Sequence, residues 1–66
     1  MEKYKHIEID LSGVDGNAFM ILASVSRQAK KQGLSKDEWA EIRKEATSGD
    51  YNHLLITIMK YFDVDA

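Results

Sequence analysis

The chain has 66 residues, of which 44% are hydrophobic and 30% are charged, and its formal net charge is −2. This composition is typical of a globular domain rather than a disordered one, and so small a net charge does not by itself indicate acidic or basic partners. The chain has no cysteine, which excludes disulfides and thiolate metal sites. A domain of this size buries only about 60% of its unfolded surface, so its stability must come from helix packing or self-association.

No apolar run approaches the length of about 20 residues that spans a bilayer. A signal peptide is not expected either, because the N-terminal sequence MEKYKHIEID contains no continuous apolar region. We therefore expect residues 1–66 to form a single small domain with a cytoplasmic location.

The first element expected in the chain is a strand. Residues 5–11 alternate in polarity, with Ile7, Ile9 and Leu11 on one face and polar side chains on the other. A period of two is typical of a strand that buries one face. The Ser-Gly pair that follows ends the alternation.

A helix is expected to begin near Asp15-Gly16-Asn17, where either Asp15 or Asn17 can cap the free amides of the first turn. Apolar residues then recur at helical spacing. The main line is Ala18, Leu22, Val25 and Ala29, with Phe19 and Ile21 beside it. Gly33 stands where a left-handed residue commonly ends a helix.

The clearest local pattern predicts the start of a second helix. Ser35 and Glu38 have the spacing of a capping box, and Leu34 and Trp39 have that of a hydrophobic staple. The helix is expected to run to about Thr47. Its apolar stripe is narrow, so it should be largely exposed and should dock through Trp39.

Gly49 and Asp50 predict the end of the second helix and the cap of a third. The face of the third helix is formed by Tyr51, Leu54, Leu55, Ile58 and Phe62. The β-branched residues 56–58 are typical of a strand, but the helical period predicts a helix through them.

Residues 62–66 alternate again and predict a short C-terminal strand that pairs with residues 5–11, in parallel orientation if each helix reverses the chain. The predicted fold class is therefore α+β. Glu8, Asp10, Asp63 and Asp65 would then repel each other on the outer face. If that repulsion dominates, the N-terminal strand is expected to pair with its copy in a second subunit.

The glycine turn at 13–16 lies where strand-to-helix turns bind phosphate. It matches neither of the two glycine-rich phosphate-binding motifs, and Asp15 places a negative charge there. A calcium loop starting at Asp10 would need an oxygen ligand, a glycine and a glutamate where Val14, Asp15 and Ile21 stand. We interpret this turn as structural.

The corner between the first two helices resembles a helix-turn-helix in Ala29, Gly33, Leu34, Trp39 and Ile42. Candidate contact residues at this corner are Arg27, Lys30, Lys31, Lys36, Trp39 and Arg43. Two glutamines, at 28 and 32, stand where apolar residues are expected, and acidic residues leave the second helix close to neutral. Nucleic-acid binding is therefore the alternative function rather than the leading one.

Catalysis is not expected. His6 and His53 are the only histidines, and neither has a partner at metal-ligand spacing. No nucleophile, base and orienting group can be assembled from the sequence. The sequence accordingly predicts no enzyme, no metal and no cofactor.

Two segments, LSGVDGNAF at 11–19 and SGDYNHLL at 48–55, resemble a group of small phage- and prophage-associated proteins of unknown function. Those proteins have an LSGPDGNAF-like motif, a Gly-Leu-Ser link and a later SGDY-x-x-L motif. This chain departs from them at Val14, where they have proline, and in its short tail after Phe62. The resemblance implies an uncharacterised phage-type protein and no known activity.

The leading hypothesis is a non-catalytic accessory protein that binds another protein or associates with itself. The contact surfaces expected are the exposed second helix and an open strand edge. The residues assigned structural roles are Asp15, Gly16, Asn17, Phe19, Gly33, Ser35, Glu38, Gly49 and Asp50.

Overall fold

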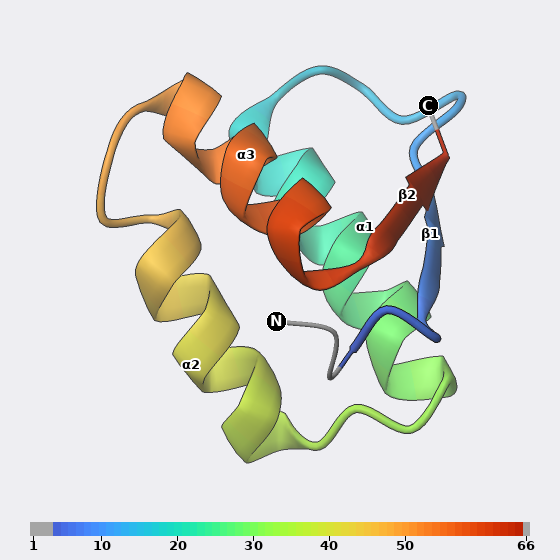
Figure 1. The fold of residues 1–66 in the computed structure, drawn as a ribbon. Helices are drawn as coiled ribbons and strands as arrows, with labels where there is room; N and C mark the ends of the chain where they lie inside the picture. The colour runs from blue at the N-terminus through green and yellow to red at the C-terminus, as the bar shows by residue number, and fades with distance from the viewer. Residues whose placement is uncertain (1–3, 66) are drawn as a thin grey trace.

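The structure is a computed structural model that describes residues 4–65. Its elements follow in the order β1 (Glu8–Asp10), α1 (Ala18–Lys31), α2 (Lys36–Ala46), α3 (Tyr51–Tyr61) and β2 (Asp63–Asp65). The strands lie side by side at one edge of the molecule, where β1 contacts α1 and β2 contacts α3 (Figure 1). Helix α2 packs against α1 and α3. The predicted α+β arrangement of a strand, three helices and a second strand is confirmed.

The two strands pair in parallel, as predicted, with Ile9 opposite Val64. Ile9 is buried and Val64 half-buried, whereas the four carboxylates of the strands are exposed. Because these carboxylates remain in water, where charge repulsion is weak and screened by salt, they do not prevent the pairing.

The other edge of β1 is occupied by two glutamine side chains of α1. Gln32 accepts a hydrogen bond from the Glu8 amide at 2.9 Å and donates one to the Glu8 carbonyl at 2.7 Å. Gln28 makes the same pair of bonds to Asp10, at 2.8 and 2.9 Å. Each side-chain amide thus replaces one residue of a neighbouring strand. The alternative prediction, that β1 pairs with a second copy, is wrong because both of its edges are occupied.

The start of α1 settles which residue caps it. Asn17 is the N-cap, and its side chain accepts a 2.8 Å hydrogen bond from the Phe19 amide. Asp15 instead accepts a 3.2 Å bond from the Asn17 amide, which stabilises the turn before the helix.

The end of α1 is a Schellman motif. Gly33 has a φ of +107°, and its amide donates to the Lys30 carbonyl at 3.2 Å. The Leu34 amide donates to the Ala29 carbonyl at 3.0 Å. The predicted role of Gly33 is confirmed, since its left-handed backbone disfavours any side chain.

The predicted caps of the other two helices are confirmed. Ser35 and Glu38 form both bonds of the capping box, at 3.1 and 2.9 Å. Asp50 is the N-cap of α3 and accepts a 2.9 Å bond from the His53 amide. Local sequence therefore determines where these helices begin.

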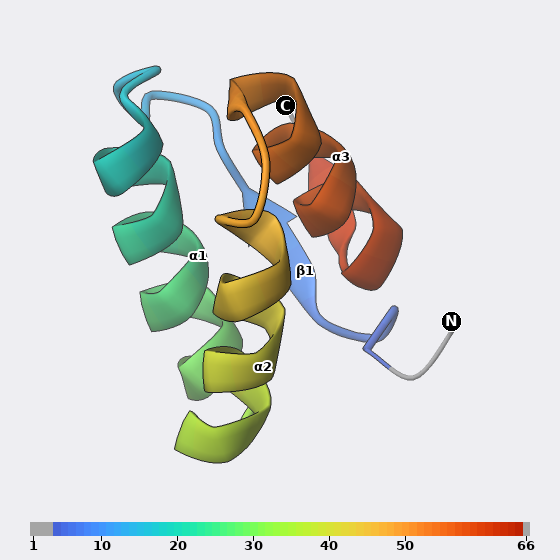
Figure 2. The ribbon, with the colours of Figure 1, turned by 90° about the vertical axis from the view of Figure 1, so that its left-hand side faces the viewer.

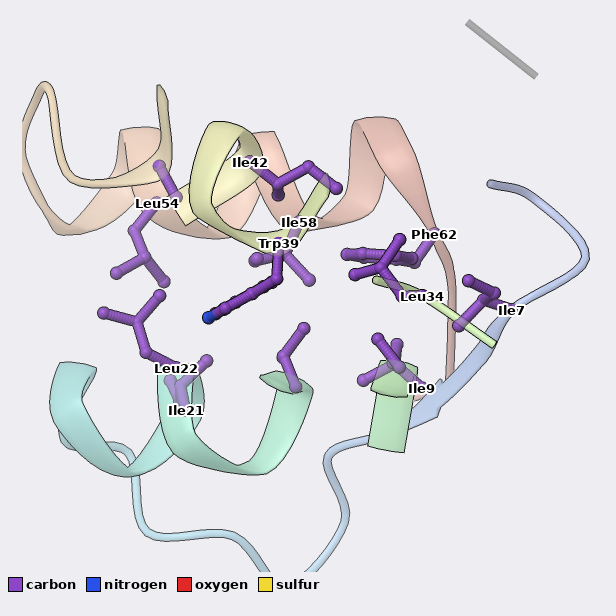
Figure 3. Packing of buried hydrophobic residues seen from close by; sticks show 13 residues of the cluster. Ile7, Ile9, Ile21, Leu22, Leu34, Trp39, Ile42, Leu54, Ile58 and Phe62 are labelled. Carbon is purple, nitrogen blue, oxygen red and sulfur yellow. The ribbon is translucent and has the colours of Figure 1, made fainter. Parts of the chain in front are cut away.

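One hydrophobic core joins all five elements. Trp39 of α2 points between Leu22 of α1 and Ile58 of α3 (Figure 3). The buried residues are Ile7, Ile9, Ile21, Leu22, Val25, Ala29, Leu34, Trp39, Ile42, Ala46, Leu54, Ile58 and Phe62. This confirms that α2 docks through Trp39. In the part of the chain that the structure describes, no helix has the length and apolar character needed to cross a membrane.

Candidate functional site

Phe19 is the most exposed large hydrophobic residue among residues 4–65, with 78% of its surface accessible. Its amide is held by Asn17, which fixes the backbone of the first turn. Leaving a side chain of this size in water forgoes about 1.5–3 kcal/mol of burial energy. The predicted structural role of Phe19 therefore applies only to its amide, and the ring lies outside the core.

Two shallow hollows adjoin Phe19, and both are lined by Phe19 and Leu22. The first has a volume of about 260 Å³ and lies between α1 and α2, with Ala23, Ser26, Trp39 and Arg43 as its other lining residues. The second has a volume of about 240 Å³ and lies where α1 meets the link between α2 and α3. We refer to the two hollows together as the Phe19 groove.

The second hollow lies where the two segments that carry the phage-type resemblance come together. The Tyr51 hydroxyl donates a 2.6 Å hydrogen bond to the Gly16 carbonyl. Ala18 and Phe19 line this hollow from the first segment, and Gly49 to Tyr51 line it from the second. The hollow is thus formed by residues that the sequence assigned to helix faces (Ala18, Phe19 and Tyr51) together with Gly49 and Asp50, which it assigned to the end of α2 and the cap of α3.

The predicted basic contact residues lie at different distances from the Phe19 groove. Arg43 lines the first hollow. Lys30 lies on the same stripe of α1 as Phe19, and Lys36 lies on the same flank of α2 as Arg43, but neither lysine lines either hollow. Arg27 lies beside that stripe, and Lys31 is turned further away. Among residues 4–65, none of the five forms an ion pair with a carboxylate.

Trp39 differs from the other predicted contact residues because it is buried, with only 7% of its surface exposed. It lines the first hollow while packing in the core. Trp39 is therefore part of the floor of the groove rather than an exposed contact.

A polar cluster elsewhere joins α2 to α3. The Glu45 carboxylate contacts the Lys60 ammonium and the Tyr61 hydroxyl, each at 2.6 Å. The hydrogen bond from Lys60, followed by that from Tyr61, lowers the pKa of Glu45. The ring of His53 lies 2.9 Å from the Glu45 carbonyl. These groups hold two helices together.

His6 is exposed, whereas the ring of His53 lies 2.9 Å from the Glu45 carbonyl and 3.2 Å from the Ser48 hydroxyl, at the end of α2. Across residues 4–65, no three side chains of the metal-ligating types gather closely enough to hold an ion.

No family model, curated protein or solved structure matches the chain.

Proposed function

We propose that this protein is a small non-catalytic accessory module, of the phage-associated type that its two motif segments resemble, and that it binds another protein through the Phe19 groove. The observation that carries the proposal is the exposure of the Phe19 ring between two hollows, the second of which is mainly apolar. Aromatic residues beside well-packed apolar pockets supply much of the energy of protein–protein interfaces.

The size of the hollows supports a protein partner rather than a small ligand. Small-molecule sites usually enclose about 300–1,000 Å³ and bury most of the ligand. The two hollows, at about 260 and 240 Å³, are smaller and shallow. They suit single side chains that project from a larger partner.

The test is affinity capture from the natural host with a photo-crosslinking amino acid at position 23, in the wall of the first hollow. We expect a defined adduct that is lost in the Phe19→Ala variant and kept in Met59→Ala, which removes an exposed side chain from α3. The adduct must also form with the purified, identified partner. An adduct that survives Phe19→Ala would contradict the proposal.

Nucleic-acid binding is the second candidate, because Arg27, Lys30, Lys31 and Lys36 are all exposed near the link between α1 and α2. However, α2 returns beside α1 in roughly the opposite direction (Figure 2), unlike the steep crossing of a helix-turn-helix. Nucleic-acid affinity comes mainly from phosphate contacts and is strongest at low salt. Gel-shift titration with single- and double-stranded probes at low salt tests this candidate, and no shift would remove it.

A further inference from the structure

We infer that the protein bound at the Phe19 groove is a second copy of this chain, which packs against the first about a two-fold axis. This inference rests on the proposed function, because it names the partner for the same groove. It is carried by the opposite charges of the two hollows and by the exposed ring that lies between them.

The two hollows differ in charge. Among the described residues, the first is lined by Arg43 and by no carboxylate, whereas the second is lined by Asp50 and by no cation. Phe19 and Leu22 line both hollows, so the exposed Phe19 ring lies between the two charges. A partner with charges of a single sign would match one hollow and be repelled at the other. The groove therefore suits a partner that carries one charge of each sign.

A second copy turned about a two-fold axis beside Phe19 is such a partner. The first hollow of each copy then faces the second hollow of the other, so Arg43 meets Asp50 of the second copy twice. The Oδ1 atom of Asp50 accepts a 2.9 Å hydrogen bond from the His53 amide, which leaves Oδ2 to face the guanidinium. The two Phe19 rings meet at the axis, where contact between aromatic rings is favourable. Closed two-fold contacts, in which a surface is complementary to itself, are the commonest among homo-oligomers.

The exposed face of α3 fits the groove less well. It carries Ile56 and Met59, but α3 contains no carboxylate to meet Arg43. The ammonium of Lys60, on the same helix, is already paired with Glu45 at 2.6 Å. Helices α1 and α3 also lie on opposite sides of α2 (Figure 2), so a contact between the groove of one copy and α3 of the next would join two different surfaces. Such contacts build rings or open chains, whereas the two-fold contact closes as a dimer.

The small size of the groove predicts a weak dimer. Six residues line the first hollow and nine line the second, and two of these are shared. A standard interface uses about 20–30 residues on each side. We therefore expect a dissociation constant on the order of 0.1 mM, which is typical of small, transient contacts.

Sedimentation velocity at low salt, from about 10 μM to about 1 mM protein, tests the inference. We expect a monomer–dimer equilibrium that is lost in Phe19→Ala. Arg43→Glu and Asp50→Lys should each weaken the dimer by about tenfold or more, because each places like charges opposite one another twice. An equimolar mixture of these two variants should restore it as a heterodimer, in which both pairs again have opposite charges. Lys31→Glu, the same charge change away from the groove, should leave the dimer unchanged.

A second variant at position 50 separates charge from folding. Asp50 caps α3, and asparagine is an equally good cap, so Asp50→Asn should also weaken the dimer while keeping the helix start. Amide chemical shifts of each variant report whether it is folded. In a mixture of isotope-labelled and unlabelled wild-type protein, NMR should detect contacts between the Phe19 rings of the two copies.

A wild-type protein that stays monomeric over the whole range would overturn the inference. So would a dimer that persists in Phe19→Ala, association that is lost only in Met59→Glu, or a mixture of the two charge variants that associates no better than either alone. If the chain is monomeric while crosslinking to a different host protein still depends on Phe19, the partner is wrong and the proposed function stands. If that dependence on Phe19 is also absent, both are wrong.

Discussion

The Tyr51 hydroxyl lies 2.6 Å from the carbonyl oxygen of Gly16 and donates a hydrogen bond to it, which joins the start of α3 to the turn before α1. These residues belong to the two segments on which the phage-type resemblance rests. A side chain at position 16 would contact this hydroxyl, since a Cβ built there lies 3.8 Å from it. The bond thus holds together the two segments that line the second hollow.

The Tyr51→Phe substitution should lower the free energy of unfolding by about 1 kcal/mol, the usual net contribution of a neutral hydrogen bond. Urea denaturation measures this loss. Hydrogen exchange should become faster at Asn17 and Phe19, near the released turn, and remain unchanged in the middle of α2. Unchanged exchange around Asn17 would show that the hydroxyl does not hold the turn.

The pH dependence of stability should report the contacts of Glu45. The hydrogen bonds from Lys60 and Tyr61 lower the pKa of Glu45 from 4.5. The stability that its ionised carboxylate adds to the folded protein is therefore fully present above pH 4.5, and it is lost as the pH falls through the lower folded-state pKa. The same contacts raise the pKa of Lys60 from 10.5 and of Tyr61 from 10.0. The stability that protonated Lys60 and Tyr61 add to the folded protein is therefore present below those values, and it is lost as the pH rises through their folded-state pKa values.

Urea midpoints measured against pH test these signs. Glu45→Gln should flatten both the acid and the alkaline limbs of the profile. Asp10→Asn should change only the acid limb, because hydrogen bonds from Ser12 lower the pKa of Asp10 and no raised pKa is coupled to it. An alkaline limb that is unaffected by Glu45→Gln would contradict the role assigned to its carboxylate.

The helix boundaries were predictable from the sequence because the interactions that set them are local. Ser35 and Glu38 bond to each other across three residues, and Gly33 adopts its left-handed backbone beside them. Such patterns leave a fixed spacing in the sequence. The parallel strand pairing also followed from the number of helices that reverse the chain.

The Phe19 groove and the hydrogen bonds that cover the second edge of β1 were not predictable, because both depend on contacts between residues far apart in the sequence. The sequence showed Gln28 and Gln32 only as polar residues in unfavourable positions, since their partners in β1 lie 18 and 24 residues earlier. Phenylalanine is usually a core residue, but the orientation of α1 leaves the ring of Phe19 exposed. Its position beside the main apolar stripe was the one available indication.

Replacing Gln28 and Gln32 with methionine should destabilise the protein by about 1 kcal/mol per residue, because the Glu8 and Asp10 backbones would exchange protein hydrogen bonds for water. An open strand edge also promotes association. The double variant should therefore sediment as larger species at high concentration, while Lys31→Met, an exposed substitution on the same helix, should not. A stable monomeric double variant would show that the glutamines do not protect this edge.

The last prediction separates the two residues that line both hollows. Leu22 has 7% of its surface exposed and Phe19 has 78%. Leu22→Ala should cost about 2–5 kcal/mol of stability, because it leaves a cavity in the core. Phe19→Ala should change stability by only about 0.5 kcal/mol or less, because its ring contributes little to folding and alanine favours a helix. Urea denaturation followed by Trp39 fluorescence compares the two variants.

A large loss of stability in Phe19→Ala would place its ring in the core and remove the observation on which the groove depends. With stability retained, any loss of partner binding in this variant is a direct effect on the surface, because the folded population is unchanged. Since folding does not require the exposed ring of Phe19, binding is the property that its replacement should impair.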